Sequence, residues 1–327
     1  MRRPVLRVHF VWMGNRFPYH CRLAVESVCV TMPDAVIDVH LIGHVPDDPH
    51  LAAIAASRRV HIRQERLDEL FAACPGGPAR YLRLLDRLST RSPATVSNLA
   101  RLAVLHRDGG VYLDTDVLLL APLDDPTVTG SYLGVEMVWA ANRGRVSHGL
   151  GVMGTVRAAP WASSWLGNRV SCRLTSGRFV QAHDMRPPRW GRLQANNAVL
   201  GAPPRSEFLA ATLTRALDVD ASARFALGPS LLDDVRHEVP DLVRVLPPPR
   251  FYAIPPGQSY RCFEDAHVQL PPDAQVLHYV ASNHPRLLAG LDIDDARFET
   301  GRAPFWRRAR EVRQGMTTRS RTHLRAL

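Results

Sequence analysis

Lysine is absent from this sequence, and all 41 cationic side chains among its 327 residues are arginine. The absence excludes Schiff-base chemistry on a lysine amine and a lysine general base. It also excludes the lysine of a Walker A loop and a Ser-x-x-Lys nucleophile pair. The chain is otherwise ordinary for a globular protein, with 46% hydrophobic and 22% charged residues, and its length suits one large domain or two smaller ones.

Cysteine is scarce, and its spacing forms no Cys-x-x-Cys pair. Scattered cysteines in an odd number predict buried free thiols rather than a disulfide framework or a zinc cluster. The positions are Cys21, Cys29, Cys74, Cys172 and Cys262. No stretch approaches the roughly 20 apolar residues of a membrane-spanning helix, and Arg7 interrupts the first apolar run. We therefore expect a soluble, non-exported, cytoplasmic protein.

The formal net charge of +10 is distributed unevenly. Residues 301–327 hold eight arginines against one acid, Glu311, and thus carry +7 of that charge. The other 300 residues are nearly neutral. We interpret residues 1–300 as one domain and 301–327 as a basic tail with a short helix and a frayed end. Such a tail can contact an anionic membrane surface, which would place the protein at the inner face of the membrane.

Hydrophobic periodicity in the N-terminal half alternates between strand and helix patterns. Strands are predicted for residues 5–13, 36–43, 60–64, 111–113 and 117–120. Helices are predicted for residues 20–30, 51–57 and 92–108. The last of these begins at Ser92-Pro93 and ends at Gly109-Gly110, as helix caps do. The alternation predicts an α/β fold with a mostly parallel central sheet.

The C-terminal half is less regular and contains no internal repeat. Its predicted strands are residues 132–138, 151–155, 243–246 and 276–280. Its predicted helices are residues 207–217 and 230–238. Proline-rich segments at 247–249 and 271–272 are typical of loops within a domain.

The chemistry concentrates at the Asp-Thr-Asp of residues 114–116, which follows a hydrophobic strand. Residues i and i+2 of an extended segment project to one side, so Asp114 and Asp116 are predicted to face one cation. Hard divalent cations take carboxylate oxygens and keep sites for the phosphates of a ligand. Upstream, Asn98 and Arg101 share a helix face that the Gly-Gly turn returns toward the carboxylates. An arginine fork beside a metal-bound diphosphate suits its charge.

The segment from Asn98 to Leu123 resembles the signature of glycosyltransferases with the DXD motif, a family of capsule-type and initiating mannosyltransferase-like enzymes. The glucosylating domains of large clostridial toxins are similar. The family pattern is Ser-Asp-x-x-Arg, then Gly-Gly-x-Tyr-x-Asp-x-Asp, and it is matched here by Ser97, Arg101, Gly109, Gly110, Tyr112, Asp114 and Asp116. Asn98 stands where the family usually has Asp, and an amide can still bond a sugar hydroxyl.

The resemblance extends to both ends of the chain. Residues 8–14 resemble the family's opening strand, whose tryptophan, here Trp12, stacks on the donor base; a core aromatic is the alternative. Residues 196–203 resemble a segment whose asparagine, here Asn197, lies in the donor pocket. Residues 276–282 resemble the terminal strand that carries a histidine and a serine, here His278 and Ser282. A structural histidine is the alternative for His278, and Asn283 replaces the tryptophan that often follows.

The resemblance implies a GT-A fold, a nucleotide-sugar donor with UDP or GDP, an Mn²⁺ or Mg²⁺ ion, and retention of anomeric configuration. Asp114 and Asp116 would hold the metal, Arg101 would contact phosphate or sugar, and residues 143–190 would form an acceptor-side insertion. The other donor-binding positions it implies are Trp12, Asn98, Tyr112, Asn197, His278 and Ser282. The acceptor could be a glycan, a lipid-linked sugar, a small molecule or a protein, and no nucleic acid is expected.

Three rival functions are weaker. The Gly-x-Gly-x-x-Gly of residues 149–154 lacks the acid about 20 residues on that a dinucleotide site needs. An aspartate-nucleophile phosphatase usually needs a lysine, and the two carboxylates of a glycosidase stand on opposite sides of the scissile bond. The remaining alternative is a non-enzymatic protein that binds nucleic acid or a membrane surface through the arginine-rich tail.

Overall fold

The computed structural model describes residues 5–43, 47–87, 93–139, 191–219, 226–264 and 266–325. The predicted strand at 151–155, Cys172 and the predicted acceptor-side insertion at 143–190 lie outside the described residues.

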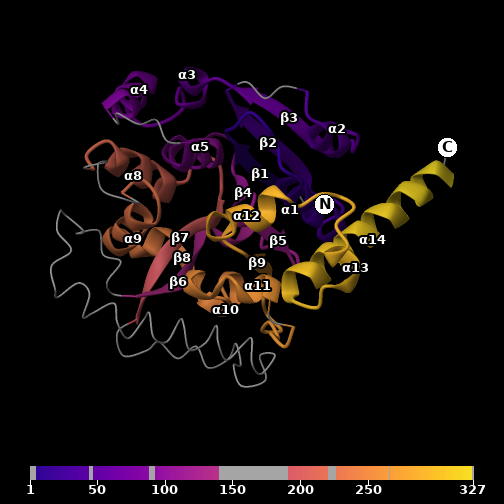
Figure 1. Cartoon of the computed structure of the whole chain (residues 1–327). Coiled ribbons are helices and arrows are strands. Elements are labelled where there is room, and N and C mark those ends of the chain that lie inside the picture. The colour runs from indigo at the N-terminus through magenta and orange to yellow at the C-terminus, as the bar shows by residue number, and fades with distance from the viewer. Residues whose placement is uncertain are drawn as a thin grey trace.

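A seven-stranded sheet forms the centre of the molecule, in the order β3-β2-β1-β4-β7-β6-β8 (Figure 1). Only β7 runs against the others, because β4 and β6 both pair with it antiparallel while the remaining pairs are parallel. β5 and β9 form a small antiparallel sheet. The strands are β1 Arg7–Trp12, β2 Val36–Ile42, β3 Val60–Glu65, β4 Gly110–Leu113, β5 Val117–Leu119, β6 Tyr132–Trp139, β7 Gly191–Ala202, β8 Arg244–Leu246 and β9 Val276–His278. The predicted α/β class with a mostly parallel sheet is confirmed.

Helices cover both faces of this sheet, and those predicted from periodicity are present within a few residues of their expected ends. The helices are α1 Tyr19–Thr31, α2 Pro49–Ala55, α3 Leu67–Leu70, α4 Pro78–Arg87, α5 Pro93–Asp108, α6 Pro126–Thr129, α8 Glu207–Ala216, α9 Pro229–Glu238, α10 Pro248–Phe251, α11 Arg261–Glu264, α12 Pro285–Ala289, α13 Arg297–Thr300 and α14 Pro304–Arg325. Short 3-10 turns are η3 Pro240–Leu242, η4 Pro256–Gln258 and η5 Ala281–Asn283.

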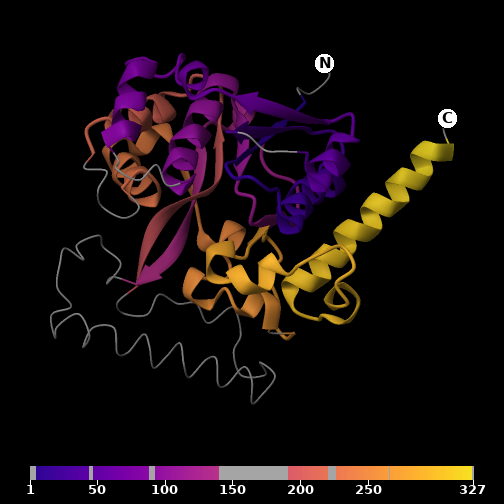
Figure 2. The same ribbon diagram turned by 45° about the horizontal axis from the view of Figure 1, so that its top comes forward.

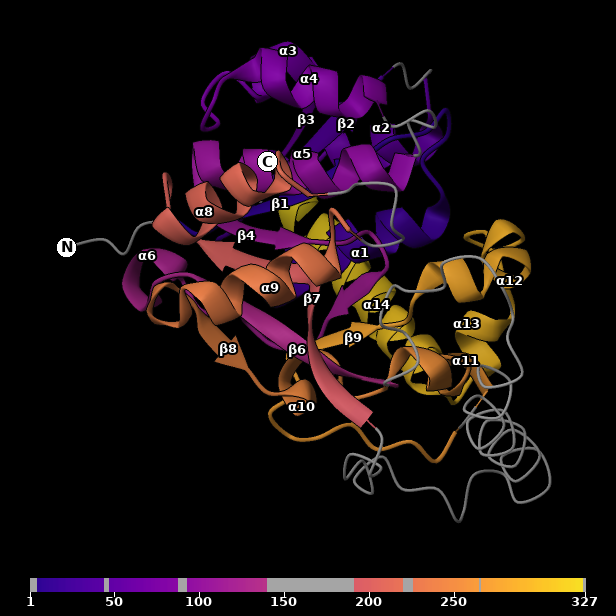
Figure 3. The same cartoon turned by 90° about the vertical axis from the view of Figure 1, so that its left-hand side faces the viewer.

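Two apolar cores lie on opposite faces of the sheet. Figure 3 shows α5, α8 and α9 over one face, where α5 supplies Leu99, Leu102 and Leu105 to the first core. On the other face, α1 packs with inward side chains of β1 and β2. Phe251 of α10 joins the same core beside β6. Because successive strand residues point to opposite faces, the odd and even positions of each strand serve different cores. The sheet is thus buried on both sides, as parallel sheets are.

The turn between α5 and β4 depends on glycine. Gly109 and Gly110 have φ angles of 65° and 105°, a region that side-chain-bearing residues rarely occupy. A Cβ on Gly110 would lie 2.4 Å from the carbonyl oxygen of Arg7. The turn therefore lets β4 pair beside β1 directly after α5 ends, which sets the position of the residues that follow β4.

The C-terminal helix begins inside the packed body, so the predicted boundary at residue 300 does not mark the edge of the packing. Phe305, Trp306, Ala309 and Val312 are buried in a third core beneath α11, α13 and β9. The predicted short tail helix is instead 22 residues long, and its outer part projects away from the body (Figure 2). Within the described part of the chain, no helix has the length and hydropathy to cross a membrane.

Candidate functional site

The candidate site lies where the strand order changes direction. The chain proceeds from β1 to β2 and β3 on one side and then places β4 on the other side of β1. In α/β sheets of this kind, ligands bind outside the carboxyl ends of the strands at such a switch point. Trp12 ends β1, and Asp114 directly follows β4. Both therefore lie at the edge where a ligand is expected.

The two aspartates flank a turn, not an extended strand as predicted. The Asp114 N–H donates to the Ala198 carbonyl of β7 at 2.8 Å, and the Val117 N–H donates back to the Asp114 carbonyl at 3.2 Å. The turn carries the chain from β4 of the large sheet into β5 of the small one. The two carboxyl groups are still close enough that Asp116 raises the pKa of Asp114. The two carboxyl groups therefore lie near each other, but a turn rather than an extended strand places them there.

Two side chains hold the carboxylate of Asp114. Its carboxylate accepts from the Arg101 guanidinium at 2.9 Å and from the Tyr112 hydroxyl at 2.5 Å. Burial is the largest influence and raises the pKa of Asp114, Asp116 raises it further, and Arg101 and Tyr112 oppose both. Asp114 is therefore fixed in orientation, and its side chain keeps 23% of its surface exposed.

Arg101 ties α5 to β4 and β7. Its side chain is 7% exposed and donates to the Asn197 carbonyl at 2.7 Å as well as to Asp114. The guanidinium also lies over the Tyr112 ring, 4.7 Å from its centroid, in a cation–π contact. Its recorded partners are protein groups, so the predicted phosphate or sugar contact of Arg101 stays a prediction. Its hydrogen bond to the Asp114 carboxylate positions that residue.

Asp116 faces the small sheet and the segment after it. One carboxylate oxygen lies 3.5 Å from His278 Nε2, and the other accepts from the Ala281 N–H at 2.9 Å. Burial alone raises the pKa of Asp116, but His278 and the Ala281 N–H outweigh it and lower that pKa to about 2. Conversely, burial lowers the pKa of His278, and the carboxyl groups of Asp116, Glu136 and Asp114 outweigh this and raise it.

Asn98 and Asn197, which come from separate elements, contact each other. The Asn197 amide donates to the Asn98 side-chain oxygen at 2.8 Å, joining α5 to β7. Gly228, the residue before α9, packs over them, since a Cβ there would lie 2.8 Å from the Asn98 amide nitrogen. The pair thus lies between three elements, beside Arg101. It can offer amide groups to hydroxyls of a ligand.

The remaining predicted positions lie around this centre. Trp12 packs edge-on against Phe17, 5.7 Å between centroids, and its indole nitrogen is buried without a hydrogen-bond partner among the described residues. Tyr112 is fully buried and reaches Asp114 through its hydroxyl. Ser282 is exposed in η5, one residue beyond the Ala281 contact to Asp116. The donor roles of these residues stay predictions.

Three site residues were missed from sequence. His20, at the start of α1, is close enough to Asp116 to interact with its charge. Glu136 on β6 is 6% exposed and interacts with His278. Tyr252 packs edge-on against His278 at 5.6 Å between ring centroids. These residues come from separate elements without a spacing pattern, so only the topology reveals them.

The residues around Asp116 fit a hard divalent cation. Mg²⁺-type sites use one or two carboxylates and complete their coordination with water and substrate phosphates. Asp114 and Asp116 supply two carboxylates, each partly exposed. Among the described residues, Asp116 accepts from the Ala281 N–H and lies 3.5 Å from His278. Asp114 accepts shorter bonds from Arg101 and Tyr112, so Asp116 is the less tightly held carboxylate. Asp116 is thus the better ligand, with Asp114 beside it.

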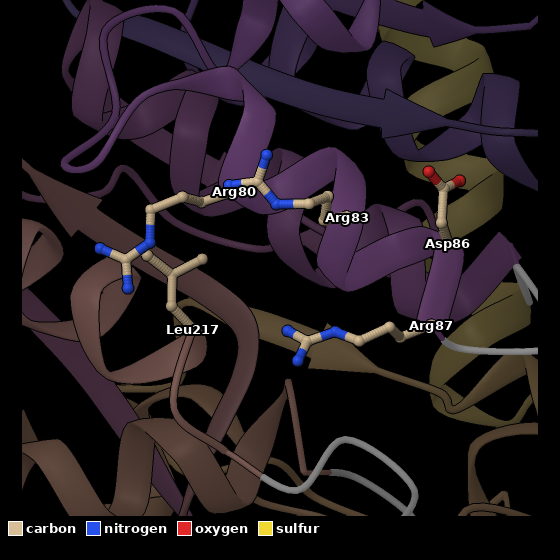
Figure 4. A pocket seen from close by; sticks show the side chains of 5 residues that line it. All are labelled: Arg80, Arg83, Asp86, Arg87 and Leu217. Atoms are coloured by element: carbon tan, nitrogen blue, oxygen red, sulfur yellow. The ribbon is translucent and has the colours of Figure 1, made fainter.

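Two other features are distant from this chemistry. His9, His40 and Asp108 are close enough together to share an ion, but His9 already contacts the Gly109 carbonyl and His40 contacts Glu65. A hollow of about 530 Å³ lies between α4 and the end of α8, lined by Arg80, Arg83, Asp86, Arg87 and Leu217 (Figure 4). Its arginines suit an anionic ligand, but none of the predicted site residues lines it.

Comparison with known proteins supports the sequence-based assignment. Residues 57–133 match the family described as glycosyltransferase sugar-binding region containing DXD motif. That range includes Asn98, Arg101, Tyr112, Asp114 and Asp116. The predicted enzyme class, a glycosyltransferase with a DXD-type sugar-binding region, is thereby confirmed. No curated protein matches the chain.

Several solved glycosyltransferases have a generally similar architecture. PaToxG glycosyltransferase aligns with a TM-score of 0.45 and 14% identity over 72% of this chain and 70% of its own. The galactosyltransferase LgtC, in complex with donor and acceptor sugar analogues, aligns with 0.43 and 16% over 94% and 95%. Apo GlyE of Streptococcus pneumoniae TIGR4 aligns with 0.45 and 12% over 97% and 64%.

Proposed function

We propose that this chain transfers a sugar from a nucleotide-sugar donor to an acceptor, with the donor diphosphate bound beside Asp116. The observation that carries the proposal is the meeting of two carboxylates, a buried arginine and a paired asparagine side chain at the switch point of the sheet. The family match over residues 57–133 supports it. A divalent Mn²⁺ or Mg²⁺ ion, when bound, would neutralise the negative charge on the departing nucleoside diphosphate.

Each side chain then has a task that its geometry permits. Asp116 would hold the cation, and Asp114, fixed by Arg101 and Tyr112, would supply the second carboxylate. Because these groups are oriented before the donor arrives, little reorganisation is needed as charge develops on the leaving group. Asn98 and Asn197 would bind sugar hydroxyls, and the indole of Trp12 would stack on the base.

The side of the site opposite Arg101 would contact the diphosphate. His278 carries a raised pKa, and a protonated imidazole beside the phosphates would add a positive charge to the cation. Ser282 is exposed on η5 and offers a hydroxyl donor. We infer retention of configuration and a UDP or GDP base from the sequence resemblance. A glycan, a lipid-linked sugar, a small molecule or a protein would be the acceptor.

The outer part of α14 would contact a membrane surface, consistent with a cytoplasmic protein at the inner face of the membrane. Many arginines of its inner part have internal partners: Arg308 donates to the Leu119 carbonyl, and Arg310 donates to the Phe298 and Gly301 carbonyls. Because these guanidinium groups already donate to carbonyls, fewer of the eight arginines of residues 301–327 are free to bind an anionic surface than the sequence suggests.

Donor turnover tests the proposal directly. Purified protein is incubated with a panel of UDP- and GDP-sugars, with Mn²⁺, with Mg²⁺ or with a chelator, and release of the nucleoside diphosphate is measured. We expect release from one donor with a divalent cation and none with the chelator. No binding and no release for any donor would contradict the proposal.

A further inference from the structure

Glu136 is a buried acid at the candidate site that the mechanism above does not use. It lies in the second half of β6 and is 6% exposed. Side chains alternate along a strand, so Glu136 shares a face with Gly134, where an added Cβ would lie 2.6 Å from the Tyr252 ring. On that face, Glu136 interacts with His278 and bonds to the side chain of Asn196 on β7. It therefore approaches the Asp-Thr-Asp turn from across the sheet.

One oxygen of this carboxyl group, Oε2, is buried with no hydrogen-bond partner among the described residues. The other buried acids of the described chain have partners: Glu26 pairs with Arg22, Asp38 with Arg7 and Arg63, and Asp233 with Arg192 and Arg236. Burying a polar oxygen without a partner costs about 1–3 kcal/mol, and more for a charged group. Such an exception in a folded protein points to function.

The chemistry around Oε2 selects the class of group that would bind it. A carboxyl oxygen without a donor needs an N–H or O–H group. Diphosphate oxygens carry negative charge and offer no such hydrogen, and like charges repel. A sugar offers several neutral O–H donors. His278 interacts with Glu136 as well as with Asp114 and Asp116. It lies where the proposed function places the diphosphate, and the transferred sugar is bonded to that diphosphate.

We propose that Glu136 is a sugar-binding residue of this site and that Oε2 accepts a hydrogen bond from a hydroxyl of the transferred sugar. The inference rests on the proposed function, because it takes the ligand to be a nucleotide sugar. The side chain of Asn196 bonds to the carboxyl group of Glu136, while Oε2 stays without a partner among the described residues. Glu136 thus contributes to the choice of donor sugar, while Asp116 contributes to binding of the diphosphate.

Calorimetric titration separates these two contributions. With Mn²⁺ present, UDP and UDP-glucose, and GDP and GDP-mannose, are titrated into the wild-type protein and into Glu136→Gln. We expect the nucleoside diphosphate to bind both proteins equally and the affinity gained from the sugar to fall about tenfold in the variant, the size of one hydrogen bond to a charged group. The melting temperature should stay level or rise, because the variant removes a buried carboxyl group whose Oε2 has no hydrogen-bond donor among the described residues.

Glu26→Gln is the matched control, since it makes the same change at a buried glutamate that is paired with Arg22 on α1. We expect it to lower the melting temperature and leave the affinity gained from the sugar unchanged. If Glu136→Gln keeps the full sugar-derived affinity, or loses nucleoside diphosphate binding together with stability, Glu136 is structural and the inference is wrong. If the wild-type protein binds neither UDP nor GDP with Mn²⁺, the proposed function itself fails.

Discussion

At the scale of single residues, some side chains of the site fix the orientation of others through hydrogen bonds. Arg101 is the main example, because it contacts Asp114, the Asn197 carbonyl and the Tyr112 ring at once. Only a planar guanidinium has donors that reach several partners in fixed directions. Replacing Arg101 should therefore disturb the position of the Asp114 carboxylate.

Arg101→Lys retains the charge and tests this role. We expect donor turnover to fall by about 10- to 100-fold and the free energy of unfolding to drop by about 1–3 kcal/mol, because charge-assisted hydrogen bonds to Asp114 and Asn197 are lost. Steady-state kinetics and chemical denaturation measure the two effects. Arg83→Lys on the exposed face of α4 is the control and should change neither quantity.

At the scale of secondary structure, the turn from α5 into β4 sets where the aspartates lie. Gly110→Ala would place a Cβ 2.4 Å from the Arg7 carbonyl oxygen at a φ of 105°. We expect a loss of about 3 kcal/mol or more in the free energy of unfolding, since steric overlap adds to backbone strain. Gly43→Ala is the matched comparison: its φ is 85°, and no atom lies within 4 Å of its Cβ. That variant should lose only about 1–2 kcal/mol; equal losses in the two proteins would argue against the overlap.

The C-terminal helix combines a core element with a projecting end. Deleting residues 301–327 would remove Phe305, Trp306 and Val312 from the third core, and we expect that protein to lose cooperative unfolding. Deleting residues 320–327 removes only the end and should shift the melting temperature by no more than about 2 °C. Differential scanning fluorimetry on both truncations checks this. A shorter deletion that unfolds the protein would show that the end of the helix belongs to the packed body.

Elements with one clear hydrophobic period were predictable, and elements with polar interruptions were not. β1 to β4, α1, α5, α8 and α9 were predicted from periodicity and caps. β7 was missed because Asn196 and Asn197 interrupt its hydrophobic pattern, and Asn197 pairs with Asn98 of the site. α4 was missed because it follows a Gly-Gly-Pro loop and has three exposed arginines.

The candidate site was predictable to the extent that its residues are close in sequence. Asn98, Arg101, Asp114 and Asp116 lie within one short segment, and their spacing indicated shared chemistry. Glu136 and His20 come from elements that only the fold brings to the Asp-Thr-Asp turn. The turn itself replaced a predicted extended strand, because β5 leaves the large sheet to pair with β9.

At the scale of the whole molecule, stability should depend on pH through buried ionic groups. Burial raises the pKa of Glu65, but hydrogen bonds from His40 and Arg107 outweigh it and lower the pKa to about 2. A depressed carboxyl pKa stabilises the folded state above the ordinary value of 4.5, and the contribution is lost as the pH falls toward about 2. We expect the free energy of unfolding to decrease over this interval.

Glu65→Gln should show a shallower decrease over the same interval when denaturant unfolding is followed at several pH values. The variant should be less stable than the wild type at pH 6 and approach it near pH 3. Parallel curves for the two proteins would mean that Glu65 does not contribute to the acid sensitivity.

The account as a whole requires that Asp116 bind the metal–diphosphate group of a nucleotide sugar. The most direct test is titration of the nucleoside diphosphate identified by the donor panel into the wild-type protein and Asp116→Asn, with and without Mn²⁺, and with circular dichroism to confirm the fold. We predict that Mn²⁺ strengthens binding to the wild-type protein by at least tenfold and has no effect on the folded variant. Mn²⁺-dependent binding of equal strength in both proteins would contradict the assignment of this site.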